Sequence, residues 1–483
     1  MFIDLDGQGP AYQQLTRALK EAILDGRLKA GTRLPSTRAL AQELGMSRIT
    51  VLSAYDQLRA EGYLHSRVGS GSYVSELQVA PPAPHPVCSA IATPSRYARR
   101  ARHHVDRSIS RMHRGLRFNM QYGEIAGLHG INTAWGRELT RAAAYTPLER
   151  QLPEGSLALR EQICSYLAHR RGIRATPDEV LIVNGAQQAF DLVARVLLDE
   201  GDRVVMEEPH YFGAWRAFAA HGADLLPVRT DGEGLACAEL PEQAPQLVCV
   251  TPSHQFPSGV AMSLPRRLAL MQYAESKSCW VLEDDYDSEF RYDSQPLAAL
   301  RSLDRTGRVI YVGTFSKVMF GSMRLGYMLL PRALYQDFVN ARYLADTGGM
   351  AIEQAAMAHF MESGAFERHL RRTGKVLKQR REALLRGLRQ HAGQRVLVDD
   401  SQAGLHVVAW LPDYDHAQLD ALVRHAHQHG LGLYPIAPCY HGEPPMPGLM
   451  LGYGGLPSSE LGEAMRLFGY CLDAAHANGF EAA

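Results

Sequence analysis

Residues 309–324 read VIYVGTFSKVMFGSMR, and this stretch decides the fold of most of the chain. Four apolar residues followed by glycine are typical of a strand buried within a sheet. Lys317 comes shortly after that strand, with the hydroxyl residues Thr314 and Ser316 before it and Arg324 beyond it. The hydroxyls and the guanidinium suit a phosphate group, and the lysine amine suits a Schiff base. The stretch therefore predicts a site for pyridoxal phosphate (PLP).

A PLP site also needs a carboxylate beside the ring nitrogen, because protonating that nitrogen makes the ring an electron sink. Candidates follow an apolar strand at 280–282, in the run Glu283-Asp284-Asp285-Tyr286-Asp287. Gly185-Ala186-Gln187 indicates a strand-to-helix turn whose amides would face a phosphate, and Tyr211 is a candidate aromatic lid. These groups follow successive strand ends, where sheets of this kind bind ligands.

Apolar runs alternate with helical stretches from about residue 118 onward. The expected strands are Val180–Val183, Arg203–Met206, Leu247–Thr251, Trp280–Leu282, Val309–Val312 and Tyr327–Leu330. This alternation predicts an α/β fold with a doubly wound sheet. A small α+β subdomain is expected at about 370–483, with strands at Leu405–Trp410 and Leu449–Tyr453.

The first 75 residues predict a separate winged helix-turn-helix domain. Pro10–Gly26 has helical periodicity, and Ser36 and Ser47 are placed to begin two short helices joined at Gly45. Two short strands follow at Tyr63–Val74, around a glycine turn. The second helix of such a motif enters the major groove of DNA. The candidate DNA contacts are Ser36, Arg38, Ser47, Arg48 and Thr50, with Gly69 and Gly71 at the wing tip.

Residues 76–117 are expected to be a linker, rich in Pro and Ala at first and in Arg later. The chain has 51 basic and 51 acidic residues. Residues 1–75 carry 9 basic and 7 acidic residues, residues 76–117 carry 8 basic and 2 acidic ones, and the remainder carries 34 basic and 42 acidic ones. The net charges are +2, +6 and −8, so a polyanion would meet the front of the chain. The arginines, among them Arg96, Arg99, Arg100 and Arg102, are interpreted as a solvated tether, a strap on DNA phosphates, or both.

The composition excludes coiled coils, collagen and wholly disordered chains, with 46% hydrophobic and 21% charged residues. Seven scattered cysteines without a CxxC pair argue against a disulfide scaffold or zinc ribbon. The acidic N-terminus is unlike a signal peptide, and no apolar run is long enough to span a membrane. We therefore expect a cytoplasmic protein with no membrane partner.

The run from Leu34-Pro35-Ser36 through Gly45-Met46-Ser47-Arg48 to Glu61-Gly62-Tyr63-Leu64 resembles the GntR family of bacterial repressors. Residues 118–483 resemble fold-type I aminotransferases, also at residues 251–259 and 451–453. Together the two parts resemble the MocR/GabR family of transcriptional regulators. The resemblance implies a GntR-type head at 1–75 and a PLP-binding effector domain at 118–483. It further implies a DNA operator, a small amine or amino acid as effector, and a homodimer whose heads cross to the partner's body.

The resemblance also assigns roles to residues. Lys317 would form the Schiff base with PLP, Asp284 would contact the ring nitrogen, Tyr286 would donate to the phenolic oxygen, and Tyr211 would stack on the ring. The phosphate would be held by Ala186, Gln187, Thr314, Ser316 and Arg324. Four positions depart from the patterns of these families. Phe256 replaces a common Asn, and Gly321 replaces the usual proline between Lys317 and Arg324. Met450 stands where aminotransferases have a carboxylate-binding arginine, and Gly213 where a GABA-responsive regulator has a second one.

Two rival functions remain open from the sequence. The chain is expected to be a regulator, but a working aminotransferase with a DNA-binding head has the same lysine, and so does a sensor of PLP itself.

His425, His427 and His429 form one further constellation, in which the first and last have metal-ligand spacing on a helix. We interpret these histidines as the C-terminus of a helix next to Gly430 and assign no metal.

Overall fold

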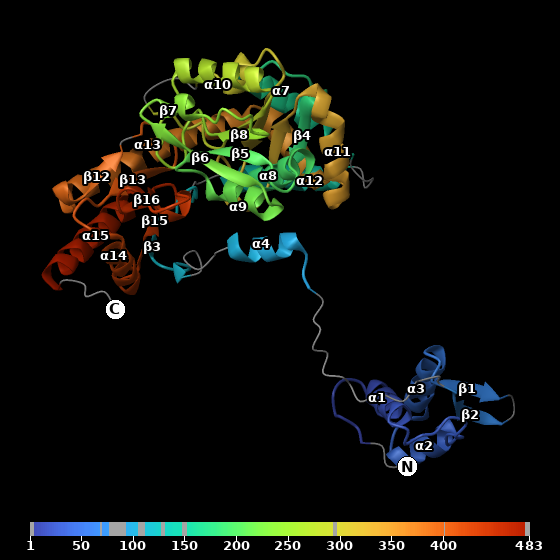
Figure 1. Ribbon diagram of the computed structural model, residues 1–483. Coiled ribbons are helices and arrows are strands. Elements are labelled where there is room, and N and C mark those ends of the chain that lie inside the picture. Colours follow the sequence, from blue (N-terminus) through green and yellow to red (C-terminus); the bar gives the residue numbers. More distant parts are fainter. Residues whose placement is uncertain are drawn as a thin grey trace. The chain divides into compact units, whose positions relative to one another are not determined.

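The computed structural model describes residues 4–67, 70–76, 93–104, 112–126, 131–146, 152–292, 297–399 and 401–478. The chain divides into two compact units, residues 1–93 and 94–483 (Figure 1). Each unit has its own buried apolar core. No helix in the described ranges has the length and hydropathy needed to cross a membrane.

The first unit is the expected winged helix-turn-helix. Its elements are α1 (Ala11–Leu24), α2 (Thr37–Leu44), α3 (Arg48–Ala60) and the antiparallel strands β1 (Leu64–Arg67) and β2 (Gly71–Val74). Gly45 ends α2 in the left-handed conformation that glycine favours, with φ 66°. Apolar residues spaced along one face of each helix, such as Leu19, Leu40 and Leu58, are fully buried and form the core.

The second unit is built on an eight-stranded sheet in the order β4-β11-β10-β9-β8-β5-β6-β7. The strands are β4 (Val180–Val183), β5 (Arg203–Glu208), β6 (Asp224–Asp231), β7 (Gly234–Leu235), β8 (Leu247–Val250), β9 (Trp280–Asp285), β10 (Val309–Thr314) and β11 (Gly326–Leu329). Strands β8, β9 and β10 run parallel, whereas β11 is antiparallel to both of its neighbours. The mixed, doubly wound α/β sheet is thereby confirmed. Strand β6 was missed because, near the sheet edge, its side chains are mostly half-exposed.

Helices cover both faces of this sheet, as the all-buried strands require. Alternate residues of β4 enter different cores: Val180 and Ile182 face one cluster, and Leu181 and Val183 face the other. The helices are α6 (Ile131–Tyr145), α7 (Leu157–Arg171), α8 (Ala186–Leu197), α9 (Phe212–His221), α10 (Leu264–Lys277), α11 (Arg332–Asp346) and α12 (Ala351–Glu362). Short 3-10 turns lie at Pro177–Glu179, Cys237–Glu239, Leu300–Leu303, Gly321–Met323, Gly393–Arg395 and Ala437–Cys439.

The C-terminal part forms the expected α+β subdomain, around the antiparallel sheet β12-β13-β16-β15. Its strands are β12 (Leu397–Asp399), β13 (His406–Trp410), β15 (Tyr434–Pro435) and β16 (Gly448–Gly452), and its helices are α13 (Ala365–His391), α14 (His416–Gln428) and α15 (Ser458–Asn478). A segment far away in sequence joins it, because β3 (Phe118–Asn119) pairs in parallel with β14 (Leu431–Gly432).

The basic segment expected to be a linker contains helix α4 (Arg96–His104), which packs against α9 of the second unit. Arg100 donates to the carbonyls of Ala220 (3.0 Å) and His221 (3.1 Å), which are orphan acceptors at the C-terminus of α9. Arg96 and Arg100 both pair with Glu200. The interpretation as a solvated tether is therefore wrong for Arg100, which the body of the protein holds. The side chain of Arg96 remains 72% exposed, and the strap on DNA phosphates stays a prediction.

Candidate cofactor pocket and nucleic-acid interface

A cavity of about 380 Å³ opens where β9 and β10 end and where α8 and α9 begin. The structure brings nine residues singled out from the sequence to the wall of this one cavity. They are Ala186, Gln187, Tyr211, Asp284, Tyr286, Thr314, Ser316, Lys317 and Arg324. They converge because parallel strands place their carboxyl ends along the same sheet edge.

Lys317 projects into the cavity just beyond β10, and its Nζ donates to the carbonyl of Gly123 at 3.2 Å. Burial lowers the pKa of this amine, while the carboxylates of Glu124, Asp287 and Asp284 oppose the shift. A lowered pKa increases the neutral fraction of the amine, and the neutral form is the nucleophile that attacks an aldehyde.

The acidic residues at the end of β9 have different partners. Glu283 accepts from the amides of Leu300 and Arg301, both at 2.7 Å, and Asp285 forms a buried ion pair with Arg171 at 2.8 Å. Asp284 lines the cavity, and its Oδ1 finds no hydrogen-bond partner among the described residues. Burial raises the pKa of Asp284 to about 8, with a further contribution from neighbouring carboxylates. A cationic N–H in the cavity would satisfy that oxygen.

One end of the cavity is built to bind an anion. Helix α8 begins there, at Gly185, whose φ of 80° only glycine adopts readily, and free amides at a helix N-terminus attract phosphate. The Arg324 guanidinium lies against Gly185, since a Cβ added at that glycine would meet it at 3.3 Å. The buried Oγ of Ser316 has no partner in the described part of the chain.

Tyr286 is held by a histidine, His254, to which sequence reasoning assigned no role toward the cofactor. Its Oη lies 2.9 Å from Nδ1 of His254, which also lies 3.0 Å from Oδ1 of Asp287. Because a carboxylate only accepts, Nδ1 carries the proton and donates to both oxygens. The hydroxyl hydrogen of Tyr286 is then available to donate into the cavity.

The Tyr211 ring packs between other aromatic side chains at the start of α9. It lies edge-on to Phe256, at 5.2 Å between centroids, and next to Phe212 at 5.1 Å. A Cβ at Gly213 would meet the Tyr211 ring at 2.5 Å. The structure thus gives a reason for glycine in place of the expected arginine: any side chain there would displace the tyrosine.

Met450 is buried in an apolar cluster with Phe256, Val408, Ile436 and Cys439. Its sulfur lies 3.9 Å from that of Cys439. Tyr211 and Tyr286, which line the cavity, pack against this cluster. The position expected from the resemblance to hold a carboxylate-binding arginine is therefore part of an apolar cluster behind the cavity wall.

Sequence reasoning missed several residues that line the cavity, among them Tyr122, Glu124, Phe212 and His406. Tyr122 packs edge-on to Phe212, Phe256 and His406, although it lies far from them along the chain. Burial lowers the pKa of His406 to about 4, so this side chain is neutral. Phe212 follows the predicted Tyr211 directly, whereas no local pattern pointed to the other three.

The donor set fits PLP. An unpartnered buried carboxyl oxygen suits the ring N–H, a helix N-terminus with an arginine and a serine suits the phosphate, and a lysine with a lowered pKa suits the aldehyde. The aromatic side chains supply apolar surface for the ring.

In the first unit, the predicted DNA contacts lie on the recognition helix and at helix starts. Arg38 and Arg48 are exposed. Ser36 Oγ accepts from the amide of Ala39, and Ser47 Oγ accepts from the amide of Thr50 and is hydrogen-bonded to its hydroxyl. Both serines therefore cap helices α2 and α3, and their hydroxyls are positioned by that role.

Ile49 and Arg33 are exposed in the first unit, and the sequence did not single them out. Ile49 is 75% exposed on α3, so its apolar side chain is accessible to an apolar group such as a thymine methyl. Gly71 opens β2 with φ 116°, and Arg33 lies beside it. Gly69 lies outside the described residues.

Comparison with known proteins agrees with this division. Residues 11–74 match the bacterial regulatory proteins of the gntR family, and residues 119–431 match the aminotransferase class I and II family. The fold and site thus define a DNA-binding regulator fused to an aminotransferase-type domain whose cofactor is PLP. The chain belongs to the MocR/GabR-type regulators of the gntR family.

Relatives match over three quarters or more of the chain. The probable rhizopine catabolism regulatory protein MocR of Rhizobium meliloti is 37% identical, over 96% of this chain and 94% of the relative. The regulator TauR of Rhodobacter capsulatus is 34% identical over 81% of this chain and 82% of the relative. The pyridoxine biosynthesis regulator PdxR of Corynebacterium glutamicum is 32% identical over 76% of each.

Solved structures similar to this chain include aminotransferases. The α-aminoadipate aminotransferase LysN of Thermus thermophilus, complexed with a phosphopyridoxyl-leucine, has a TM-score of 0.72 and 27% identity, covering 79% of this chain and 98% of that one. The kynurenine aminotransferase of Pyrococcus horikoshii has a TM-score of 0.69 and 26% identity, and the match covers 76% of this chain and 93% of that one.

Proposed function

We propose that this chain is a ligand-responsive transcriptional regulator that holds PLP at Lys317 and senses a small amine or amino acid there. The head binds an operator in double-stranded DNA, and the aminotransferase-type unit changes the affinity or geometry of that binding. A regulator of this kind acts in the cytoplasm, where the DNA is.

One observation carries this proposal: the chain combines an exposed recognition helix with a cavity whose unpartnered polar atoms complement PLP. Bound PLP supplies an aldehyde carbon that reacts with amines and a ring that withdraws electrons. Asp284 would hold a proton at the ring nitrogen, and Tyr286 would donate to the phenolic oxygen. Gly185, Ser316 and Arg324 would fix the phosphate and so orient the ring toward Lys317.

The apolar cluster around Met450, which packs against cavity-lining residues, and the glycine at 213 favour sensing over turnover. An α-carboxylate buried beside the ring needs a charged, preferably bidentate partner, and leaving it unpaired costs several kcal/mol. We therefore expect no sustained transamination with ordinary α-amino acids.

Helix α9 offers a route from the cavity to the head. Its first turn contains Phe212, which lines the cavity, and Tyr211 precedes it. Its last carbonyls accept from Arg100 of α4, the first helix of the second unit in chain order. An effector that moves the start of α9 would therefore move the attachment point of α4. Allosteric coupling needs such an element with different contacts in two states.

A homodimer with crossed heads, as the family resemblance implies, would present two recognition helices to paired half-sites. When two heads bind together, a small displacement in each body would change the distance between the two recognition helices and so the affinity for the operator.

The second candidate function is an active aminotransferase. It is favoured by the complete set of cofactor-facing groups around Lys317 and by the similarity to solved aminotransferases. A sensor of PLP itself is a third, since one relative is named a pyridoxine biosynthesis regulator.

These functions are separated by DNA binding and product formation measured on the same preparation. The full-length protein selects its operator from a random duplex library, and its affinity is then measured without PLP, with PLP, and with PLP plus each amine of a panel. Keto-product release is followed in parallel with excess keto acid.

We expect one amine to change operator affinity with at most one equivalent of product per site. Sustained turnover with unchanged DNA binding would establish the enzyme instead, and a response to PLP alone would establish the PLP sensor. Lys317→Ala should lose the amine response and the borohydride-reducible link to PLP. Lys277→Ala, which removes a lysine outside the cavity, should retain both.

A further inference from the structure

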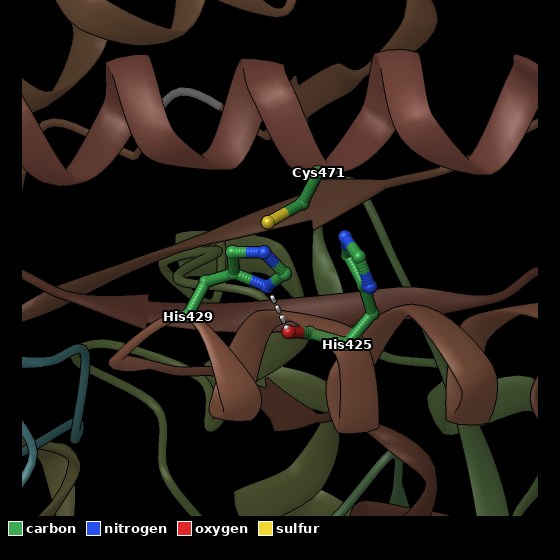
Figure 2. A group of neighbouring side chains, drawn as sticks. All are labelled: His425, His429 and Cys471. Atoms are coloured by element: carbon green, nitrogen blue, oxygen red, sulfur yellow. Dashed lines mark hydrogen bonds between the residues drawn. The ribbon is translucent and has the colours of Figure 1, made fainter.

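The histidines near the end of α14 meet a cysteine that lies more than 40 residues further along the chain. His425 and His429 are one helical turn apart, and Cys471 lies on α15, which packs against α14. One donor atom from each residue lies within 4.8 Å of the other two. In Figure 2 the three side chains converge, and the ring nitrogen of His429 that makes no hydrogen bond there faces the cysteine sulfur.

We propose that His425, His429 and Cys471 form a binding site for a divalent transition metal ion of the Zn²⁺ type. This site is separate from the cofactor cavity and does not depend on the proposed regulatory function. Two imidazole nitrogens and one thiolate are a donor set that Zn²⁺ takes and that Ca²⁺ and Mg²⁺ do not.

The orientation of His429 supports this proposal. Its Nδ1 lies 2.9 Å from the carbonyl oxygen of His425. A carbonyl only accepts, so Nδ1 carries the hydrogen and Nε2 presents its lone pair. Metal-binding histidines are commonly fixed in this way, by a hydrogen bond from the other ring nitrogen to a backbone carbonyl. The same bond satisfies a carbonyl at the end of the helix, as expected from the sequence.

The charge states also suit a cation. Burial lowers the pKa of His425, and the neighbouring His429 lowers it further, so its imidazole favours the neutral, ligating form. Burial raises the pKa of Cys471 to about 11, so the metal must displace the thiol proton.

The spacing is close to that of an occupied site. Bond lengths of about 2.0 Å to nitrogen and 2.3 Å to sulfur put the donor atoms of a tetrahedral Zn²⁺ site roughly 3.3–3.6 Å apart. Ligation requires the donor atoms, which lie within 4.8 Å of one another, to move closer together, and His429 is exposed. Its exposure also gives water access to the fourth coordination position. An ion here would join α14 to α15 and stabilise the folded unit.

The test uses the untagged full-length protein, stripped with a chelator and dialysed against Zn²⁺ or Co²⁺. Zinc per chain is measured by elemental analysis, and Co²⁺ is followed by its visible d–d bands, which lie to the red of PLP absorption. We expect one saturable equivalent, a cobalt spectrum of tetrahedral type with thiolate ligation, and a zinc-dependent rise in the thermal midpoint.

His425→Ala, His429→Gln and Cys471→Ser should each lose that equivalent. His427→Ala is the matched control, because its ring lies against His113 on another side of α14, and Cys439→Ser controls for loss of a buried thiol. The exposed His429 keeps the test valid if Cys471→Ser fails to fold. An equivalent that persists in His429→Gln, or the absence of any saturable equivalent in the unaltered chain, would overturn the proposal.

Discussion

The hydroxyl of Tyr286 lies 2.9 Å from Nδ1 of His254 at the wall of the cofactor cavity. Since His254 donates its Nδ1 proton, the hydroxyl hydrogen of Tyr286 would be available to the phenolic oxygen of PLP, as proposed above. The Tyr286→Phe variant lacks that donor, so more negative charge should remain on the phenolic oxygen. The proton that this oxygen shares with the nitrogen of Lys317 should then be held more tightly. The pH midpoint of the visible absorbance change of the PLP-loaded protein should therefore rise.

Tyr273→Phe provides the control for this measurement. Tyr273 donates to the carbonyl of Pro241 and does not line the cavity, so its variant should titrate like the unaltered protein. An unshifted midpoint in Tyr286→Phe would show that Tyr286 does not contact the phenolic oxygen.

Asp284 predicts a pH dependence of stability in the cofactor-free protein. Its pKa is raised from 3.8 to about 8 by burial, so between these values the folded state binds a proton that the unfolded state has lost. The free energy of unfolding should therefore fall as the pH rises from about 4 to 8. Glu207, Glu283 and Glu289, with pKa values raised to about 7, act in the same direction.

Asp284→Asn should flatten this decline without removing it, because the three glutamates remain. Thermal midpoints at pH 5 and pH 8 measure the difference. The variant should also bind PLP more weakly, since the ring N–H loses its carboxylate. Equal pH dependence in the two proteins would mean that Asp284 is ionised in the folded state.

Arg48 and Ile49 predict two kinds of DNA contact. Arg48→Ala should weaken binding to the selected operator by about 1–3 kcal/mol if its guanidinium contacts a base, and relax the preference at one position per half-site. Ile49→Ala should reduce the preference for thymine at a neighbouring position, because it removes an exposed apolar contact. Selection from a random library by each variant measures both effects.

Arg27→Ala removes the same charge from an exposed position outside α3 and should leave sequence preference unchanged. If Arg48→Ala instead weakens binding to all duplexes equally, Arg48 contacts phosphate.

Arg100 predicts a separation of effector binding from DNA response. Arg100→Ala removes the hydrogen bonds from α4 to the C-terminus of α9. PLP and the effector should still change the visible spectrum, because the cavity is unaltered, whereas the effector should no longer change operator affinity. Arg99→Ala is the matched control, since Arg99 is exposed and bonds only locally to Pro94. A full DNA response in Arg100→Ala would exclude this route.

The sequence by itself determined the two folds and the cofactor-facing groups at strand ends. Buried strands such as β4 appear as continuous apolar runs, helix starts such as Ser36 have capping side chains, and Lys317 follows its strand directly. These signals are local, so propensity and periodicity reveal them without knowledge of the packing.

Tertiary structure alone decided that Glu283 and Asp285 of the acidic run are paired away from the cavity, whereas Asp284 and Asp287 line it. It also brought Tyr122 and His406 to the cavity, seated Arg100 on α9, and placed Cys471 beside two histidines. Each of these relationships joins residues far apart in the chain, and no periodicity records such a pairing. They arise because packing of helices and sheets must bury apolar faces and satisfy polar groups together, and only the folded chain specifies which side chains then meet.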